Sequence, residues 1–271
     1  MLHQLVFLGV VTLLFRLEYL LARSVCRKTM PCWGENKIRL FSVRVVSLTH
    51  AFFSSIAVLT SLTDPRFIKS PYDFFKEETQ FVFLFSMGYF LYDLFDMGIH
   101  GELPNSKEYI LHHSLALFAF SSIIVSEKFF GVAVIGLLVE VQTVFLHSRT
   151  IVRLLIKGSE ESVMSEFFIQ MNMICLFLFR HAPTLWLLYF LMIVDEKCGV
   201  AVKLIVCGSL LFLEAHNLHL TQSIAKSDGF FGFERQKLDE DTVDPLGSVR
   251  TSECEKIKKT GGFTRKMRKV F

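Results

Sequence analysis

Seven runs of mostly apolar residues, each long enough to cross a bilayer, divide the chain. About 20 such residues form a transmembrane helix, because a helix rises 1.5 Å per residue through a hydrocarbon core of about 30 Å. The runs lie at about 2–22, 40–62, 79–99, 109–126, 129–150, 167–193 and 200–221. Of the six prolines only Pro183 falls inside a run, where the missing N–H predicts a kink. The pattern predicts an all-α, polytopic transmembrane helical bundle.

Composition agrees with this class of protein. Apolar residues make up 52% of the 271 residues, 29 of which are Phe. A water-soluble domain of this length does not bury so much apolar surface, so lipid must cover part of it.

The basic residues predict the orientation of the bundle. Cytosolic segments carry an excess of Lys and Arg. Twenty basic residues follow spans one, three, five and seven, against six in the other three loops. This bias places the C-terminal tail in the cytosol and, with an odd number of spans, the N-terminus outside. The first span lacks a basic leader, so we interpret it as an anchor, with a cleaved signal peptide as the alternative.

Three regions follow from these features: an N-terminal anchor with a basic loop at 1–39, a membrane domain at 40–222 and a basic cytosolic tail at 223–271. The tail predicts contact with anionic lipid headgroups, at about 1 kcal/mol per basic residue near the surface. A solvated tail is the other interpretation, and the two are compatible. Because aromatic residues do not alternate with the basic residues of the tail, we expect no nucleic-acid partner.

Charged residues inside the predicted spans are the main candidates for a functional site. Asp93, Asp96, Glu140 and Arg180 lie within apolar runs. Each would cost roughly 2.5–3.5 kcal/mol at mid-bilayer if it were unpaired. The sum of these costs is too large unless the four residues are paired, protonated or in contact with a water-filled cavity.

The predicted directions of the spans gather these residues in one half of the bundle. Together with histidines, they come late in spans that run inward or early in a span that runs outward, with Arg180 near mid-depth. The histidines are His100, His112, His113, His147, His181, His216 and His219. Adjacent His112 and His113 differ by about 100° of helix rotation, so at most one of them points to the centre of a narrow cavity. The pattern predicts a polar cavity that opens toward the cytosolic leaflet.

Two kinds of role are assigned to this set. If the protein is an enzyme, the catalytic candidates are His112, His113, Asp93 and Asp96, with a histidine as base or nucleophile. The lipid-binding candidates are Glu140, His147, Arg149, Arg180, His216 and His219. Helix–helix hydrogen bonds and ion pairs are the structural alternative for every one of them. No metal-binding box, phosphate-cradling glycine loop or dinucleotide motif is present, so we expect neither a metal nor a cofactor.

Four segments in order resemble the TLC-domain superfamily. They read GYFLYDLFDMGIH (88–100), EYILHHSLALFAF (108–120), LLVEVQTVFLHSR (137–149) and NMICLFLFRHAP (172–183). The resemblance covers roughly residues 40–222 and implies a six-helix TLC core, to which span one is an added anchor. The positions that mark the family are Asp93, Asp96, His112, His113, Glu140, Arg149, Arg180 and Pro183.

Within the superfamily the chain resembles most the calfacilitin-type TLC-domain proteins. This resemblance implies a regulator of membrane phospholipid composition that limits polyunsaturated acyl chains, with membrane phospholipids as partners and the plasma membrane as location. Ceramide synthases, in the same superfamily, transfer acyl groups from acyl-CoA, but the aspartates of their motif are missing from EVQTVFLHSRT (140–150). A lipid acyltransferase that uses acyl-CoA is therefore the alternative, and an auxiliary protein of a channel is a further one. The endoplasmic reticulum is the alternative location.

Overall fold

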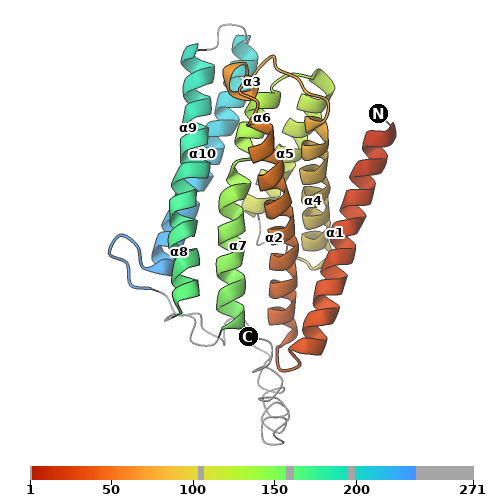
Figure 1. Cartoon of the computed structure of the whole chain (residues 1–271), viewed down its shortest axis with the longest axis vertical. Helices are drawn as coiled ribbons and strands as arrows, with labels where there is room; N and C mark the ends of the chain where they lie inside the picture. The colour runs from red at the N-terminus through yellow and green to blue at the C-terminus, as the bar shows by residue number, and fades with distance from the viewer. Residues whose placement is uncertain (1, 103–106, 157–161, 195–198, 236–271) are drawn as a thin grey trace, which may run out of the picture.

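The computed structural model contains seven helical segments that are long and apolar enough to cross a membrane, as predicted. It describes residues 2–102, 107–156, 162–194 and 199–235 (Figure 1). The segments are Leu2–Thr29, Glu35–Ser61, Thr79–Ile99, Tyr109–Ser126, Phe130–Leu155, Val163–Val194 and Val200–Asp228. The described part of the chain contains no strand, so the all-α bundle is confirmed. The basic tail beyond residue 235 lies outside the described residues.

The described residues form ten α-helices and two π-helical turns, all of which except α3 belong to these segments. The helices are α1 (Leu2–Thr29), α2 (Glu35–Ser61), α3 (Arg66–Lys69), α4 (Thr79–Ile99), α5 (Lys107–Ser126), α6 (Phe130–Gly136), α7 (Val139–Leu155), α8 (Val163–Leu176), α9 (Ala182–Tyr189) and α10 (Val200–Asp228). The π-helical turns, Phe177–His181 and Phe190–Val194, follow α8 and α9. Two helices of the described chain, α3 and α6, are short.

The helices extend beyond the predicted spans mainly at one end of the bundle. The first span ends at Thr29 instead of 22, the second begins at Glu35, the fifth ends at Leu155 and the seventh at Asp228. Hydropathy marks only the part of a helix that needs apolar cover, whereas backbone hydrogen bonding continues into the polar region. All four extensions lie at the end predicted to face the cytosol, called the cytosolic end below.

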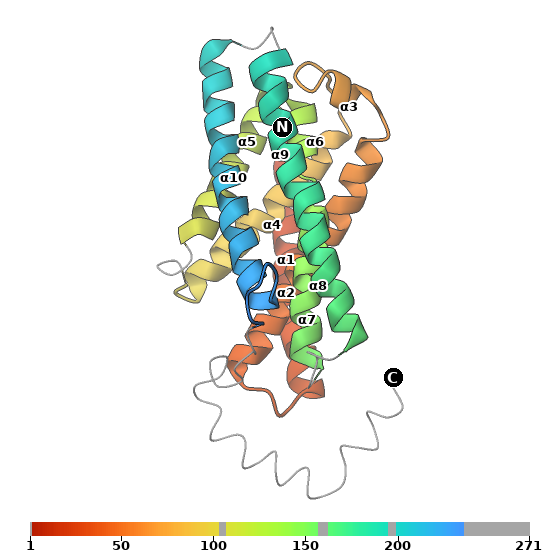
Figure 2. The same cartoon turned by 90° about the vertical axis from the view of Figure 1, so that its left-hand side faces the viewer.

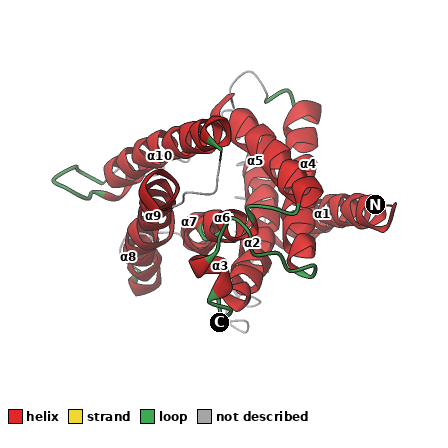
Figure 3. Cartoon of the chain, turned by 90° about the horizontal axis from the view of Figure 1, so that it is seen from above, coloured by secondary structure: helices red, strands yellow, loops and turns green. Residues whose placement is uncertain are grey.

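Two groups of helices flank α7 and are linked through it. Seen from above, α8, α9 and α10 lie on one side, and α1, α2, α4 and α5 on the other (Figure 3). Helix α7 packs against α2 and α8, while α1 packs against α2 and α4. The views in Figures 1 and 2 show the long helices running roughly parallel to one axis, with α10 opposite α5. Polar residues on α4, α5, α7 and α10 can therefore face one interior.

Helix α1 is part of the packed bundle. Phe15 and Tyr19 are buried against α4, and an aromatic cluster continues from Phe15 to Tyr89 at a ring-centroid distance of 5.5 Å. Gly88 permits this approach, since a Cβ atom at this position would lie 2.6 Å from Val11 Cγ1. Small residues allow close backbone contact between membrane helices, whose association rests on van der Waals packing. The added anchor of the prediction is thus packed tightly onto the core.

In the sixth span the backbone hydrogen-bonding pattern changes from α-helical to π-helical just before Pro183. This residue stands at the start of α9, directly after the π-helical turn Phe177–His181. A wider turn accommodates the proline ring and the carbonyl group that its missing N–H leaves without a donor. The same turn carries Arg180 and His181, both buried. The irregularity expected at Pro183 is present, and it positions two polar residues of the interior.

Candidate functional site

His113 and Asp93 form the closest pair among the predicted catalytic candidates. The Nδ1 atom of His113 on α5 lies 3.2 Å from the Oδ2 atom of Asp93 on α4. The imidazole is buried and stacks on Phe90 at a centroid distance of 4.8 Å. The contact is not a hydrogen bond, but a carboxylate beside Nδ1 stabilises a positive charge on the ring and leaves Nε2 for another partner. This arrangement suits a histidine that accepts or donates a proton.

His112 points to a different neighbour from His113, as the 100° rotation between adjacent residues requires. Its ring stacks on that of His216 on α10, at 5.9 Å and with an interplanar angle of 17°. Both residues keep some accessible surface. The structure therefore places His113 at the α4–α5 contact and His112 between α5 and α10. The two stacked rings form a contact between α5 and α10.

Glu140 on α7 lies close to a histidine on α2, His50, that is not among the residues predicted from the sequence. The Nδ1 atom of His50 lies 3.8 Å from the Oε2 atom of Glu140, and both residues are buried. His50 stacks on Tyr89 at 4.1 Å, and the Tyr89 hydroxyl donates to Ser47 Oγ at 2.8 Å. These contacts join α2, α4 and α7 around one carboxyl group in the middle of the bundle.

Arg180 is held by neutral groups. Its Nε donates to Gln142 Oε1 at 2.6 Å, and its other nitrogens donate to Thr143 at 2.9 Å and Asn217 at 3.4 Å. The Gln142 amide in turn donates to Asn172 at 2.7 Å. Glu140 interacts with the guanidinium electrostatically. Amide and hydroxyl acceptors satisfy the donors of a buried guanidinium without adding a second full charge. Arg180 thus ties α7 to α10 beside Glu140.

His181 and the polar residues of α10 form a separate contact. Its Nδ1 lies 2.5 Å from Glu214 Oε1, and its Nε2 lies 2.8 Å from Thr221 Oγ1. The Thr221 hydroxyl also donates to the carbonyl group of Asn217 at 2.8 Å. Because that hydroxyl hydrogen points to the backbone, the contact joins the π-helical turn to α10 and does not activate Thr221.

Asp96 lies one turn from Asp93 but belongs to another cluster. Arg16 on α1 donates to its Oδ1 at 2.8 Å, and Arg39 on α2 donates to its Oδ2 at 3.3 Å. His100, which follows α4 directly, lies 3.3 Å from the carboxylate. Asp96 is buried, while Arg39 also binds Glu102. This cluster, called the Asp96 clamp below, fastens α1 and α2 to the cytosolic end of α4.

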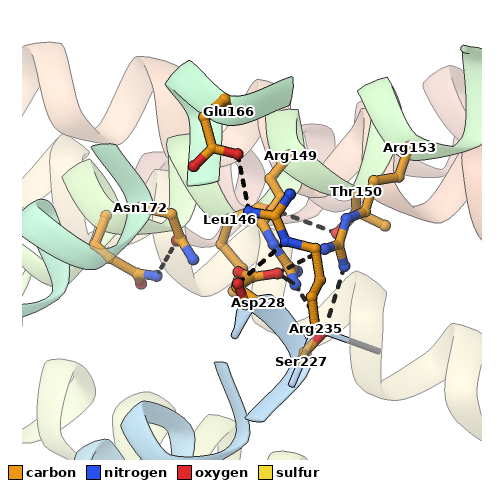
Figure 4. Close-up of polar contacts among 10 residues, drawn as sticks. Leu146, Arg149, Thr150, Arg153, Glu166, Asn172, Ser227, Asp228 and Arg235 are labelled. Atoms are coloured by element: carbon orange, nitrogen blue, oxygen red, sulfur yellow. Dashed lines mark hydrogen bonds and ion pairs between the residues drawn. The ribbon is translucent and has the colours of Figure 1, made fainter. Parts of the chain in front are cut away.

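Arg149 belongs to a similar cluster at the cytosolic ends of α7 and α10. It binds Ser227 and the buried carboxylate of Asp228, to which Arg153 also donates at 2.7 Å (Figure 4). Arg235 links this cluster to Glu166 on α8 at 2.8 Å. Figure 4 shows these side chains converging where α10 ends. The cluster, called the Asp228 clamp, connects three helices.

Two more predicted lipid-binding residues differ in exposure. His147 on α7 is 6% exposed, and its Nδ1 atom has no hydrogen-bond partner. His219 on α10 is exposed and lines an outer groove of about 500 Å³ together with Phe231 and Phe233. Of the predicted set, His147 faces the interior and His219 faces outward. Although His219 is only three residues from His216, it lies on a more exposed face of α10.

The site also contains polar residues that are not among the candidates predicted from the sequence. Gln142, Asn172 and Asn217 are fully buried, but uncharged amides give little signal against an apolar run. His50 and Arg44 lie inside the predicted second span, so the ionisable-residue criterion could have found both. In the described part of the chain no group of three His, Cys, Asp or Glu side chains is arranged to hold a metal ion.

Fold and site together define a class: a polytopic helical membrane protein with paired histidines and carboxylates inside its bundle. A family model described as the TLC domain matches residues 40–226, so the chain belongs to the TLC-domain family. It is 29% identical over 226 residues to the human TLC domain-containing protein 1, covering 80% of this chain and 87% of that protein.

Two further relatives show similar agreement. The chicken (Gallus gallus) TLC domain-containing protein 1 is 29% identical over 187 residues, 69% of this chain and 73% of its own. The zebrafish (Danio rerio) TLC domain-containing protein 2 is 30% identical over 154 residues, 56% of this chain and 61% of its own. No solved structure matches the chain.

Proposed function

We propose that this protein regulates the acyl-chain composition of membrane phospholipids and thereby membrane fluidity, limiting polyunsaturated chains. Membership of the TLC-domain family, whose members act in membrane lipid functions, supports the proposal in general terms. The sequence resemblance to phospholipid-regulating members supports the particular role. The proposed partners are membrane phospholipids.

One structural observation carries the proposal. Buried ring nitrogens of His50, His113 and His147 have no hydrogen-bond partner inside the bundle, while the surrounding helices expose apolar side chains outward. His112 and His216 keep accessible surface between α5 and α10, and the His113–Asp93 pair lies next to them. An intramembrane polar site bounded by lipid-exposed helices suits a ligand with a polar head and apolar chains. A phospholipid has that chemistry.

The test is a phospholipid acyl-chain profile of cells that lack the protein. Deletion is expected to raise the polyunsaturated fraction of phosphatidylcholine and phosphatidylethanolamine, and the wild-type chain is expected to restore it. A His112→Ala/His113→Ala double variant should fail to restore it at equal expression. His219→Ala, which removes an outward-facing histidine of α10, is the matched control and should restore it fully. Unchanged profiles after deletion contradict the proposal.

Acyl transfer is the second candidate, and the His113–Asp93 contact favours it. A histidine with a carboxylate at 3.2 Å is suited to remove a proton from an acceptor hydroxyl or amine. The acyl donor would be acyl-CoA from the cytosol, with release of the free thiol. Purified protein given labelled acyl-CoA and lysophospholipid acceptors should form a labelled product, and Asp93→Asn should slow this about 10²-fold or more, the usual contribution of general base catalysis. Absence of product with every acceptor removes this candidate.

We further propose the plasma membrane as the location, with the endoplasmic reticulum membrane as the alternative, and contact of the tail with anionic headgroups. Cell-surface biotinylation of an intact, tagged chain distinguishes the two membranes. Removal of residues 236–271 should weaken binding to vesicles that contain phosphatidylserine and leave the helical bundle folded.

A further inference from the structure

Arg44 on α2 is the unpartnered arginine of the described chain. Each of the other described arginines donates at least one hydrogen bond to a side chain, whereas Arg44 makes neither a hydrogen bond nor an ion pair with the residues that the structure describes. Its Nε atom is buried without a partner. The side chain is half-buried, and because a guanidinium keeps its proton under ordinary conditions, it is a positive charge with no anion beside it among the described residues.

Arg44 and His147 lie at similar depth on two helices, α2 and α7, that pack against each other. Arg44 is nine residues from the start of α2, and His147 is eight residues from the end of α7, which places both about 12–14 Å from the cytosolic end at 1.5 Å per residue. Arg44 interacts electrostatically with His147 and with Tyr89 on α4. Three helices therefore surround one positive charge in the cytosolic half of the interior.

The carboxylates of the interior are engaged elsewhere. Asp93 contacts His113, Asp96 contacts Arg16 and Arg39, and Glu140 contacts His50. No described carboxylate lies within ion-pair distance of Arg44. An unpaired charge inside a span is unfavourable, although less so near the end of the span than at the bilayer centre. An anion from outside the chain would offset this cost, and it would meet a guanidinium fork and a free imidazole nitrogen.

We propose that Arg44 and His147 bind a phosphate ester that enters from the cytosolic leaflet. A phosphate group presents several oxygens, so it can accept bidentate donation from the guanidinium and a further bond from the Nδ1–H of His147. This inference rests on the proposed function and names the part of the ligand that the site recognises. Two ligands supply this chemistry: the phosphodiester of a phospholipid and the phosphates of acyl-CoA.

Binding to the purified full-length protein in detergent tests the proposal with two matched pairs of ligands. Phosphatidylcholine is compared with diacylglycerol of the same chains, and acyl-CoA with the acyl thioester of N-acetylcysteamine, which lacks phosphate. Wild type should bind at least one phosphate-bearing ligand more tightly than its phosphate-free counterpart. Arg44→Gln should lower the affinity for that ligand about tenfold or more and leave the affinity for the phosphate-free ligand unchanged. The pair that responds identifies the source of the phosphate.

Control variants separate recognition from folding. Arg66→Gln removes an exposed arginine paired with Asp64 and should change no affinity. Arg44→Lys keeps the charge without the fork and should retain part of the preference. Thermal unfolding confirms that each variant is folded. The proposal is overturned if wild type shows no phosphate preference, if Arg44→Gln keeps it, or if Arg44→Gln weakens both members of a pair equally. The lipid profile of deleted cells, by contrast, tests the proposed function itself.

Discussion

Asp93 and Asp96 stand one helical turn apart on α4 and meet different surroundings. Two arginines and a histidine from three helices surround the Asp96 carboxylate. Asp93 contacts one histidine, His113, and keeps 15% of its side chain exposed. The first carboxylate pairs with two arginines, which are always charged, while the second pairs, within the described chain, only with a histidine.

The number of charged partners distinguishes two kinds of charged residue in the bundle: those that hold helices together and those that we propose act in function. The Asp96 and Asp228 clamps lie at the cytosolic end, and each joins helices that are distant in sequence. The residues around His113, Glu140 and Arg44 lie deeper, and several of their polar atoms lack partners. Each clamp carboxylate binds two arginines and so fixes the bundle, whereas the deeper carboxylates pair, among the described residues, only with histidines and lie beside polar groups that are available to a ligand.

Breaking the Asp96 clamp is expected to have the largest effect on stability. Asp96→Ala leaves Arg16, Arg39 and His100 without their shared anion, and removal of one partner from a buried ion pair costs about 3–5 kcal/mol. Because Arg16 is 34% exposed, the lower end of this range is expected. Chemical unfolding of the purified protein measures the loss. A change below about 1 kcal/mol would show that the clamp is not structural.

Enlarging Gly88 tests whether the clamp depends on the close approach of α1 to α4. In Gly88→Ala the new Cβ meets Val11, and overpacking of this kind costs about 1–3 kcal/mol. Val11→Ala makes room for it, so the double variant should recover part of the stability. If Gly88→Ala unfolds like wild type, then α1 is a loosely attached anchor.

Asp93→Asn should change function far more than stability. The amide keeps the size of the side chain and its position beside His113, and no hydrogen bond joins the two residues, so the cost is about 1 kcal/mol or less. Restoration of the phospholipid profile in deleted cells should nevertheless be lost, since the amide no longer stabilises a protonated imidazole. The comparison between the two aspartates fails if Asp93→Asn destabilises the protein as much as Asp96→Ala does.

His219→Ala is expected to have the smallest effect. The side chain is exposed on α10, so the free energy of unfolding should stay within about 0.5 kcal/mol of wild type. His216→Ala on the same helix removes the ring that stacks on His112 and should impair the lipid phenotype. Equal behaviour of the two variants would show that the interior position of His216 has no functional meaning.

The membrane architecture could be predicted from the sequence because the bilayer imposes a strict requirement. A spanning helix needs about 20 apolar residues, so the seven runs identify seven spans with no knowledge of their packing. The same reasoning selects Asp93, Glu140 and Arg180, because charge inside an apolar run is costly wherever the helix stands. Arg44 and His50 satisfied that criterion too and were overlooked within the second span.

The partners of these residues depend on the tertiary structure. Partner choice follows from the rotation of each helix about its axis and from its neighbours in the bundle, and neither leaves a mark in the local sequence. Rotation separates Asp93 from Asp96 and turns His112 toward α10 while His113 meets α4. The sequence by itself determined which polar residues lie within the membrane. Only packing decided which of them are neutralised and which remain free for a ligand, because pairing depends on distances between helices.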